Sequence, residues 1–159
     1  MTKKFQDKEI IGWSEYVDFP DWGIDGLEAK VDTGARTSAL HVEDLKKLKN
    51  DMVKFDVILC NKQVHKRVPV KAKAIKWGRV RSSTGEYKIR CFCRTKIRIG
   101  HIEKEIDVTL VSRQKMVFRM LIGRKALEDD FIIDVTKRAV LGEKPRKKKR
   151  SQMKEEIES

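Results

Sequence analysis

The chain has 159 residues, of which 40% are hydrophobic and 38% charged, a composition that fits one small globular domain and excludes a disordered chain. Lysine and arginine number 37 against 24 acids, so the net charge is +13 and favours anionic partners such as nucleic acid or acidic polypeptide. The first residues are polar and no apolar run approaches the roughly 18 residues that cross a bilayer, so we expect a cytoplasmic protein without membrane contact.

The first half of the chain shows apolar residues at every second position, the pattern of half-buried β-strands. Residues 9–19, which mix apolar and polar positions, fit a first strand, and the alternation predicts further strands in residues 27–31, 53–59 and 68–74. Pro20 and Gly23 mark a turn after the first of them, and the second runs into a loop that starts at Asp32. Residues 42–48 suit either a short helical turn or a strand, and both interpretations stay open.

The second half continues the β pattern and adds one helix. We expect a long hairpin over residues 74–99, a second hairpin over 97–110, a strand over 118–122, and a last hairpin that joins 131–135 to 139–141. One short helix is expected from Arg124 to Asp129. Strand signals roughly every 8 to 12 residues, joined by short turns, predict an all-β fold closed into a barrel.

Charge and composition also divide the chain into three parts. Residues 1–8 are expected to be a flexible N-terminus, residues 9–142 the β-barrel domain, and residues 143–159 a disordered tail. The tail contains five consecutive bases from Arg146 to Arg150, which makes it a candidate contact for nucleic acid.

The segment Ala29 to Leu40, A-K-V-D-T-G-A-R-T-S-A-L, contains the candidate catalytic residue, Asp32. An aspartate at a strand end is presented on a tight turn, the glycine two positions later permits close backbone approach, and the hydroxyl of Thr33 can brace the loop. The tripeptide alone is weak, because it should occur by chance in roughly a few per cent of chains of this length.

A second landmark stands about ninety residues on, where two apolar residues precede Gly123 and Arg124 and a short helix follows. The sequence therefore resembles the retropepsins, which are one-lobe aspartic peptidases. In both, an aspartate loop is followed by a hairpin and then by an apolar-apolar-Gly-Arg strand. Four longer strings narrow the resemblance, and they are A-K-V-D-T-G-A-R-T-S-A-L-H-V, R-S-S-T-G-E at 81–86, T-L-V-S-R at 109–113 and M-L-I-G-R-K-A-L at 120–127. Over about residues 9–142 the chain is similar to the retropepsin-like family known as ATP-dependent zinc proteases, found beside RimK-type ATP-grasp ligases.

The resemblance implies a retropepsin-like barrel and an aspartic peptidase that acts as a homodimer, because one lobe supplies one aspartate. Two Asp32 carboxylates would share a proton, and one would activate water while the other acts as acid. Thr33 and Gly34 would support the loop and Ala35 would line the cleft. The flap over the cleft would consist of Ser82, Ser83, Thr84, Gly85 and Glu86.

The substrate is expected to be a peptide or an acidic protein, because the associated ligases add acidic residues to protein termini and the chain offers a group of bases near these motifs. The candidate substrate-binding bases are Lys30, Arg36, Arg81, Arg113 and Arg124. The alternative function is a catalytically inactive binding module of the same fold that holds acidic protein tails or RNA.

The family's name also implies zinc and ATP, which the residues support poorly. The chain has neither a GxxxxGK[ST] loop nor a His-Glu-x-x-His motif. Cys91 and Cys93 fall on one face of a predicted strand, with Cys60 and His65 as possible neighbours, but structural zinc usually takes ligand pairs at tighter spacing. We therefore expect no cofactor and no metal site, and no disulfide between the odd three cysteines.

Overall fold

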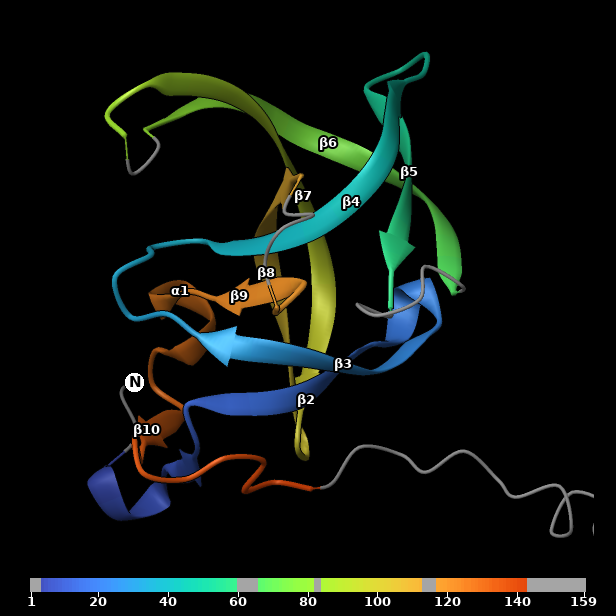
Figure 1. Ribbon diagram of the computed structural model, residues 1–159. Helices are drawn as coiled ribbons and strands as arrows, with labels where there is room; N and C mark the ends of the chain where they lie inside the picture. Colours follow the sequence, from blue (N-terminus) through green and yellow to red (C-terminus); the bar gives the residue numbers. More distant parts are fainter. Residues whose placement is uncertain (1–3, 60–65, 82–83, 113–116, 143–159) are drawn as a thin grey trace, which may run out of the picture.

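The computed structural model describes residues 4–59, 66–81, 84–112 and 117–142, which form mainly β-strands (Figure 1). The strands are β1 (Glu9–Ile11), β2 (Ser14–Phe19), β3 (Ile24–Val31), β4 (Ser38–Lys47), β5 (Met52–Ile58), β6 (Arg67–Arg81), β7 (Tyr87–Ile99), β8 (Ile102–Val111), β9 (Met120–Ile122) and β10 (Phe131–Ile133). One α-helix, α1 (Arg124–Leu127), and two 3-10 turns, η1 (Phe5–Asp7) and η2 (Pro20–Trp22), complete the described elements. The all-β prediction with one short helix after Gly123 is confirmed.

The hydrogen-bonded strands form a closed ring, as expected for the retropepsin-like fold. Following neighbours, the order β2–β3–β9–β4–β8–β7 returns to β2, and β5 and β6 form a second path from β4 to β7. β3 and β4 run parallel to β9 and β8 respectively, while the hairpin partners are antiparallel. A closed ring leaves few free strand edges and surrounds one core.

The core follows from the alternation seen in the sequence, because every second side chain of each strand points inward. Phe19 and Phe55 are among the largest side chains that are fully buried. The indole of Trp22 stacks on Phe19 at 5.3 Å between ring centroids and meets Phe55 edge-on at 5.5 Å. Burial of one such ring stabilises the fold by about 1.5–3 kcal/mol.

The ambiguous residues 42–48 belong to a strand. β4 continues to Lys47 and pairs with β5, with a register shift between Glu43 and Lys46. Asp44 in this bulge has φ of 56°, in the left-handed region. The bulge explains why the apolar alternation breaks here and why the sequence pattern suited a helical turn equally well.

The expected last hairpin is wrong. Of its two segments, residues 131–133 form β10, which pairs in parallel with β1 at the other end of the described chain. Residues 139–141 form no strand, because the backbone N–H groups of Val140 and Leu141 donate to the carboxylate of Glu15, each at 3.0 Å. The first expected strand, residues 9–19, is likewise divided into β1 and β2.

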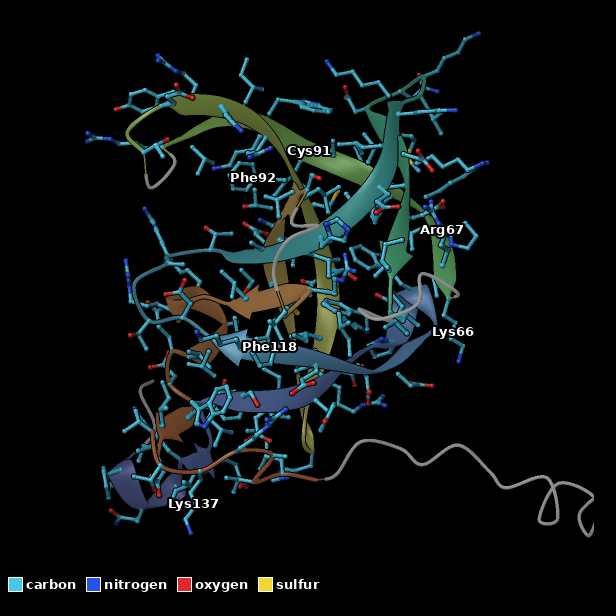
Figure 2. All side chains as sticks on the ribbon, viewed as in Figure 1. Lys66, Arg67, Cys91, Phe92, Phe118 and Lys137 are labelled. Atoms are coloured by element: carbon cyan, nitrogen blue, oxygen red, sulfur yellow. The ribbon has the colours of Figure 1, made fainter. Side chains whose placement is uncertain are left out.

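The hairpin of β6 and β7 extends past the ring. In Figure 1 its outer end and the loop between β3 and β4 both lie at the left of the molecule. Figure 2 labels Cys91 and Phe92 where the hairpin leaves the ring, and Arg67 at the opposite end of β6. No helix within the described ranges is long and apolar enough to cross a membrane.

Candidate active site

Asp32 follows the last residue of β3, and its loop is closed by short-range hydrogen bonds. The backbone N–H of Gly34 donates to Oδ1 of Asp32 at 3.0 Å, and the N–H of Ala35 donates to the Asp32 carbonyl at 3.2 Å. The Asp32 N–H donates to the carbonyl of Ile122, the last residue of β9, at 2.9 Å. The carboxylate is thus fixed in a tight turn, while Thr33 and Gly34 stay exposed.

The start of α1 is hydrogen-bonded to this loop. The Arg124 guanidinium donates to the carbonyl of Thr33 at 2.8 Å, and the Arg124 backbone N–H donates to the carbonyl of Ala35 at 2.8 Å. The backbone N–H of Lys125 donates to the carbonyl of Arg36 at 3.0 Å. The two landmarks that the sequence analysis singled out are therefore in direct contact.

Gly123 is required by close packing against the same loop. A Cβ atom at this position would lie 2.6 Å from the backbone carbon of Thr37 and 2.9 Å from the backbone nitrogen of Ser38. The Gly123 N–H donates to the Ser38 hydroxyl at 3.0 Å, a contact that the sequence did not single out. The glycine of the Leu-Ile-Gly-Arg landmark thus allows β9 to touch the chain that leaves the Asp32 loop.

A row of side chains on neighbouring strands connects the long hairpin with the strand that carries Asp32. Each member is the direct register partner of the next, across β6, β7, β8, β4, β9 and β3. These cross-strand partners are Lys76, Phe92, Thr109, Ala39, Leu121 and Lys30. The row occupies the sheet face opposite the core, since the adjacent Met120, Ile122 and Leu40 belong to the core cluster.

This row was not predicted from the sequence, although the sequence holds a signal for it. Phe92, Thr109 and Leu121 are each buried and each lies between two buried neighbours on its strand. Strands buried on both faces read as continuous apolar runs in place of alternating ones, and Met120 to Ile122 is such a run.

The predicted flap is described only in part. Ser82 and Ser83 lie outside the described residues, whereas Thr84, Gly85 and Glu86 form the turn that leads into β7. Gly85 has φ of 88°, a conformation that favours glycine. The hairpin itself is confirmed by the pairing of Arg81 with Tyr87.

The predicted basic residues fall into two groups. Lys30, Arg36 and Arg124 are exposed. Arg36 and Arg124 lie within or directly against the Asp32 loop, and Lys30 lies on β3 two residues before Asp32. Arg81 is exposed at the outer end of β6, on the hairpin, and Arg113 lies outside the described residues. Among the described residues, the Asp32 carboxylate forms no ion pair.

The described residues do not fit a zinc ion. No group of three or more His, Cys, Asp or Glu side chains that could hold a metal occurs among them, and Cys60 and His65 fall outside. The sulfur atoms of Cys91 and Cys93 are 4.0 Å apart in the core, and burial raises the pKa of Cys93 to about 12. Because zinc binds thiolate, such a pair is a poor ligand set.

Comparison with known proteins identifies the family. The model of the RimB-like family, described as retropepsin-like aspartic endopeptidase RimB, matches residues 10–144. The chain belongs to the RimB-like family. The match covers the Asp32 loop, the long hairpin and the Gly123–Arg124 landmark, which are the three features on which the retropepsin resemblance rested.

The RimB-like chain is also similar to longer curated proteins. It is 36% identical over 143 residues to a probable alpha-L-glutamate ligase of Desulfotalea psychrophila, covering 86% of this chain and 30% of the relative. A protein of the same name from Shewanella pealeana is 31% identical over 141 residues, covering 87% of this chain and 31% of the relative. The chain thus spans about a third of the length of these relatives.

A solved structure supports the fold. The crystal structure of a protein of unknown function from Legionella pneumophila matches with a TM-score of 0.70 at 22% identity, covering 84% of this chain and 98% of that one. At this identity the match concerns the fold of the RimB-like chain and carries no statement about its chemistry.

Proposed function

We propose that this chain is one half of a homodimeric aspartic peptidase in which Asp32 is the catalytic residue. The observation that carries the proposal is the Asp32 loop, whose carboxylate is oriented by the Gly34 N–H and whose backbone is tied to Arg124 at 2.8 Å. A catalytic group must be held in a fixed position, and a double-anchored turn at a strand end does so. Membership of the RimB-like family, described as retropepsin-like aspartic endopeptidase, supports this reaction class.

In the proposed mechanism the Asp32 carboxylates of two chains face each other and share one proton. The ionised carboxylate takes a proton from a water molecule as the water oxygen bonds to the carbonyl carbon of the substrate, and the other carboxyl gives its proton to the carbonyl oxygen. The tetrahedral intermediate then collapses. The carboxyl that took the proton from water gives it to the amine nitrogen as the C–N bond breaks, and a hydroxyl of the intermediate gives its proton to the other carboxylate, so that the pair again holds one proton. The exposure of Thr33 and Gly34 leaves that side of the loop open for a second chain.

The proposed substrate is a glutamate-rich tail or an acidic peptide. A ligase of the kind named among the relatives joins glutamate through amide bonds, and a peptidase in the same setting would hydrolyse such bonds. The chain's association with an ATP-grasp ligase is part of this proposal. Exposed Lys30, Arg36 and Arg124 lie around the Asp32 loop and would attract carboxylates before the scissile bond is positioned.

The first test is hydrolysis of a glutamate-tailed peptide by the wild type and by Asp32→Asn, followed by mass spectrometry. Wild type should release glutamate or shorter peptides, and Asp32→Asn should lose this activity by a factor of 100 or more, on the order of what a removed acid–base group costs. Asp25→Asn provides a matched control, because Asp25 is an exposed aspartate on the same strand, away from the loop. If wild type binds the peptide and hydrolyses nothing, the chain is a binding module and the peptidase proposal is wrong.

The second test concerns the acidic substrate. Arg36→Gln and Arg113→Gln should weaken binding of a poly-glutamate peptide, whereas Lys96→Gln, an exposed base on the distant part of β7, should not. Equal affinity in all three variants would show that Arg36 and Arg113 do not bind the acidic substrate. Sedimentation at increasing protein concentration tests the homodimer, which must form where hydrolysis is observed.

A further inference from the structure

The core-facing side of the β6–β7 hairpin continues beyond the core into solvent. Along β7, Cys93 and Cys91 are buried, whereas the next two residues on the same face, Ile89 and Tyr87, are 70% and 58% exposed. On β6, Trp77 is the register partner of Cys91 and is 40% exposed. Exposed large apolar side chains that continue a core face indicate a surface that contacts something else.

Cations alternate with these apolar side chains. Arg79 is the register partner of Ile89, and its guanidinium lies 4.6 Å from the centre of the Tyr87 ring. The ammonium of Lys47, from β4, lies 4.3 Å from the centre of the Trp77 ring. We call this surface the arm face, and it consists of Lys47, Trp77, Arg79, Arg81, Tyr87 and Ile89.

The arm face lies on the other side of the hairpin from the row that leads toward Asp32, and Arg81, which the sequence predicted to bind substrate, belongs to the arm face. Phe92 and Lys76, which begin the row toward Asp32, belong to the opposite face of the hairpin, since they alternate with Cys91 and Trp77. Gly78 packs closely on that opposite face, where a Cβ would lie 3.0 Å from the Phe92 ring. A ligand on the arm face would therefore not occupy the position of a substrate at Asp32.

Charge restricts what the arm face can bind. Three of the six arm-face residues are bases, Lys47, Arg79 and Arg81, and none of the six is an acid. A second copy of the chain docked here would bring like charges together in a molecule that already carries +13. An anionic partner is favoured, and the exposed rings require that this partner also has apolar or planar groups.

We propose that the arm face binds single-stranded nucleic acid. Its phosphates would pair with Lys47, Arg79 and Arg81, and two of its bases would stack on Trp77 and Tyr87. A polyglutamate tail would satisfy the cations alone and would leave Trp77, Tyr87 and Ile89 in water, so it fits this surface less well. Aromatic rings on a β-sheet beside cations are the general means by which proteins hold unpaired bases.

The spacing of the rings agrees with this ligand. Trp77 shares its register position with Cys91, and Tyr87 lies four residues further along β7, a separation of about 13 Å at 3.3 Å per residue. Arg79 lies at the position halfway between them, at the level of Ile89. An extended strand of nucleotides can thus place one phosphate near Arg79 and a base on each side of it.

The test is fluorescence anisotropy with fluorescein-labelled oligoribonucleotides and oligodeoxyribonucleotides of about 10 unpaired nucleotides, within the site sizes of single-strand binders. Full-length wild type should bind, and affinity should fall steeply as salt rises from about 50 to about 200 mM. Tyr87→Ala should weaken binding roughly five- to hundredfold, the range for one base stacked on an aromatic side chain. Comparison of the two oligonucleotides distinguishes RNA from DNA as the natural ligand.

Lys88→Gln is the matched control, because Lys88 is exposed on the opposite face of the same hairpin, paired with Val80. Arg79→Gln and Lys88→Gln each remove one positive charge. Lys88→Gln measures the effect of a charge that lies outside the arm face, and Arg79→Gln should weaken binding more than Lys88→Gln does. The proposal is overturned if wild type does not bind, or if Tyr87→Ala binds as well as wild type. It is also overturned if Lys88→Gln loses as much affinity as Arg79→Gln, or if poly-glutamate competes at equal charge concentration. Circular dichroism of each variant confirms that it is folded.

Discussion

The guanidinium of Arg124 donates a hydrogen bond to the backbone carbonyl of Thr33 at 2.8 Å and thereby connects residues that are 91 positions apart in the sequence. With the bond from the Arg124 N–H to the Ala35 carbonyl, it fixes two residues of the turn that presents Asp32. The exposed loop therefore depends on a distant segment for its conformation, and this dependence can be measured.

Arg124→Ala should loosen the Asp32 loop without unfolding the domain. Loss of one partly exposed hydrogen bond costs about 1 kcal/mol, which corresponds to roughly fivefold faster exchange of amides that open with the loop. Hydrogen exchange at Ala35, whose N–H is bonded to the Asp32 carbonyl, reports this directly. Lys125→Ala is the control, because the recorded contact of Lys125 to the loop uses its backbone N–H alone. Equal exchange in the two variants would show that the Arg124 side chain does not hold the loop.

Gly123→Ala should destabilise the whole domain. The added Cβ would approach the Thr37 backbone to 2.6 Å, so β9 and the chain after the Asp32 loop would have to separate. We expect a loss of roughly 3 kcal/mol or more in the free energy of unfolding, measured by denaturant titration. Gly23→Ala makes a useful comparison, since a Cβ there meets no atom within 4 Å and only the left-handed φ of 67° opposes it. That variant should lose about 1 kcal/mol. Equal losses would contradict the packing role of Gly123.

Glu15→Gln should release the segment that follows β10. The buried Glu15 carboxylate accepts from the N–H groups of Gly12, Val140 and Leu141, at 2.7, 3.0 and 3.0 Å. An amide keeps one acceptor oxygen and turns an NH₂ group toward a donor, so we expect a loss of about 1–3 kcal/mol and faster proteolysis after Lys137. Glu28→Gln, which affects an ion pair with Arg138 on the surface, should cost less than about 1 kcal/mol. The prediction is refuted if the two variants have the same melting temperature.

Stability should fall in alkaline solution because of Cys93. Burial raises the pKa of this thiol from 9.0 to about 12 in the folded chain. Above pH 9 the unfolded chain releases the proton while the folded chain retains it, so unfolding becomes more favourable as pH rises from about 9 toward 12. Chemical denaturation of wild type and Cys93→Ala between pH 8 and about 11 should show a steeper decline in wild type. Parallel pH profiles would mean that Cys93 titrates alike in both states.

Local patterns predicted most of the strands, because an inward side chain at every second position follows from burial of one sheet face. Residues 53–59 and 68–74 are examples, and both lie in antiparallel neighbours β5 and β6. The same reasoning failed where a distant partner decides the conformation. Phe131 pairs with Glu9, and Val140 bonds to Glu15, so neither contact could be inferred from nearby residues.

The residues of the candidate site likewise divide into those that the sequence could identify and those that depend on distant partners. Asp32, Gly123 and Arg124 could be selected because a family resemblance fixed their order along the chain, and the structure brings the Asp32 loop into contact with Ile122 and Arg124. The continuous apolar runs around Phe92 and Leu121 indicate strands buried on both faces, but the alignment of these residues in one row, and the contact of Ser38 with Gly123, depend on strand register across the sheet. A register is set by the whole ring, and no single segment encodes it.

The parallel pairing of β1 with β10 has a consequence for biosynthesis. β1 is made early, but its hydrogen-bonding partner is Phe131–Ile133, near the end of the described residues. Contacts between such distant segments form late, because the intervening chain must first be brought together at an entropic cost. A nascent chain that has emerged only as far as β8 would therefore lack both β9 and β10. The fold is expected to close only after residue 133 has left the ribosomal exit tunnel, which arrest-peptide force measurements on chains of increasing length can detect.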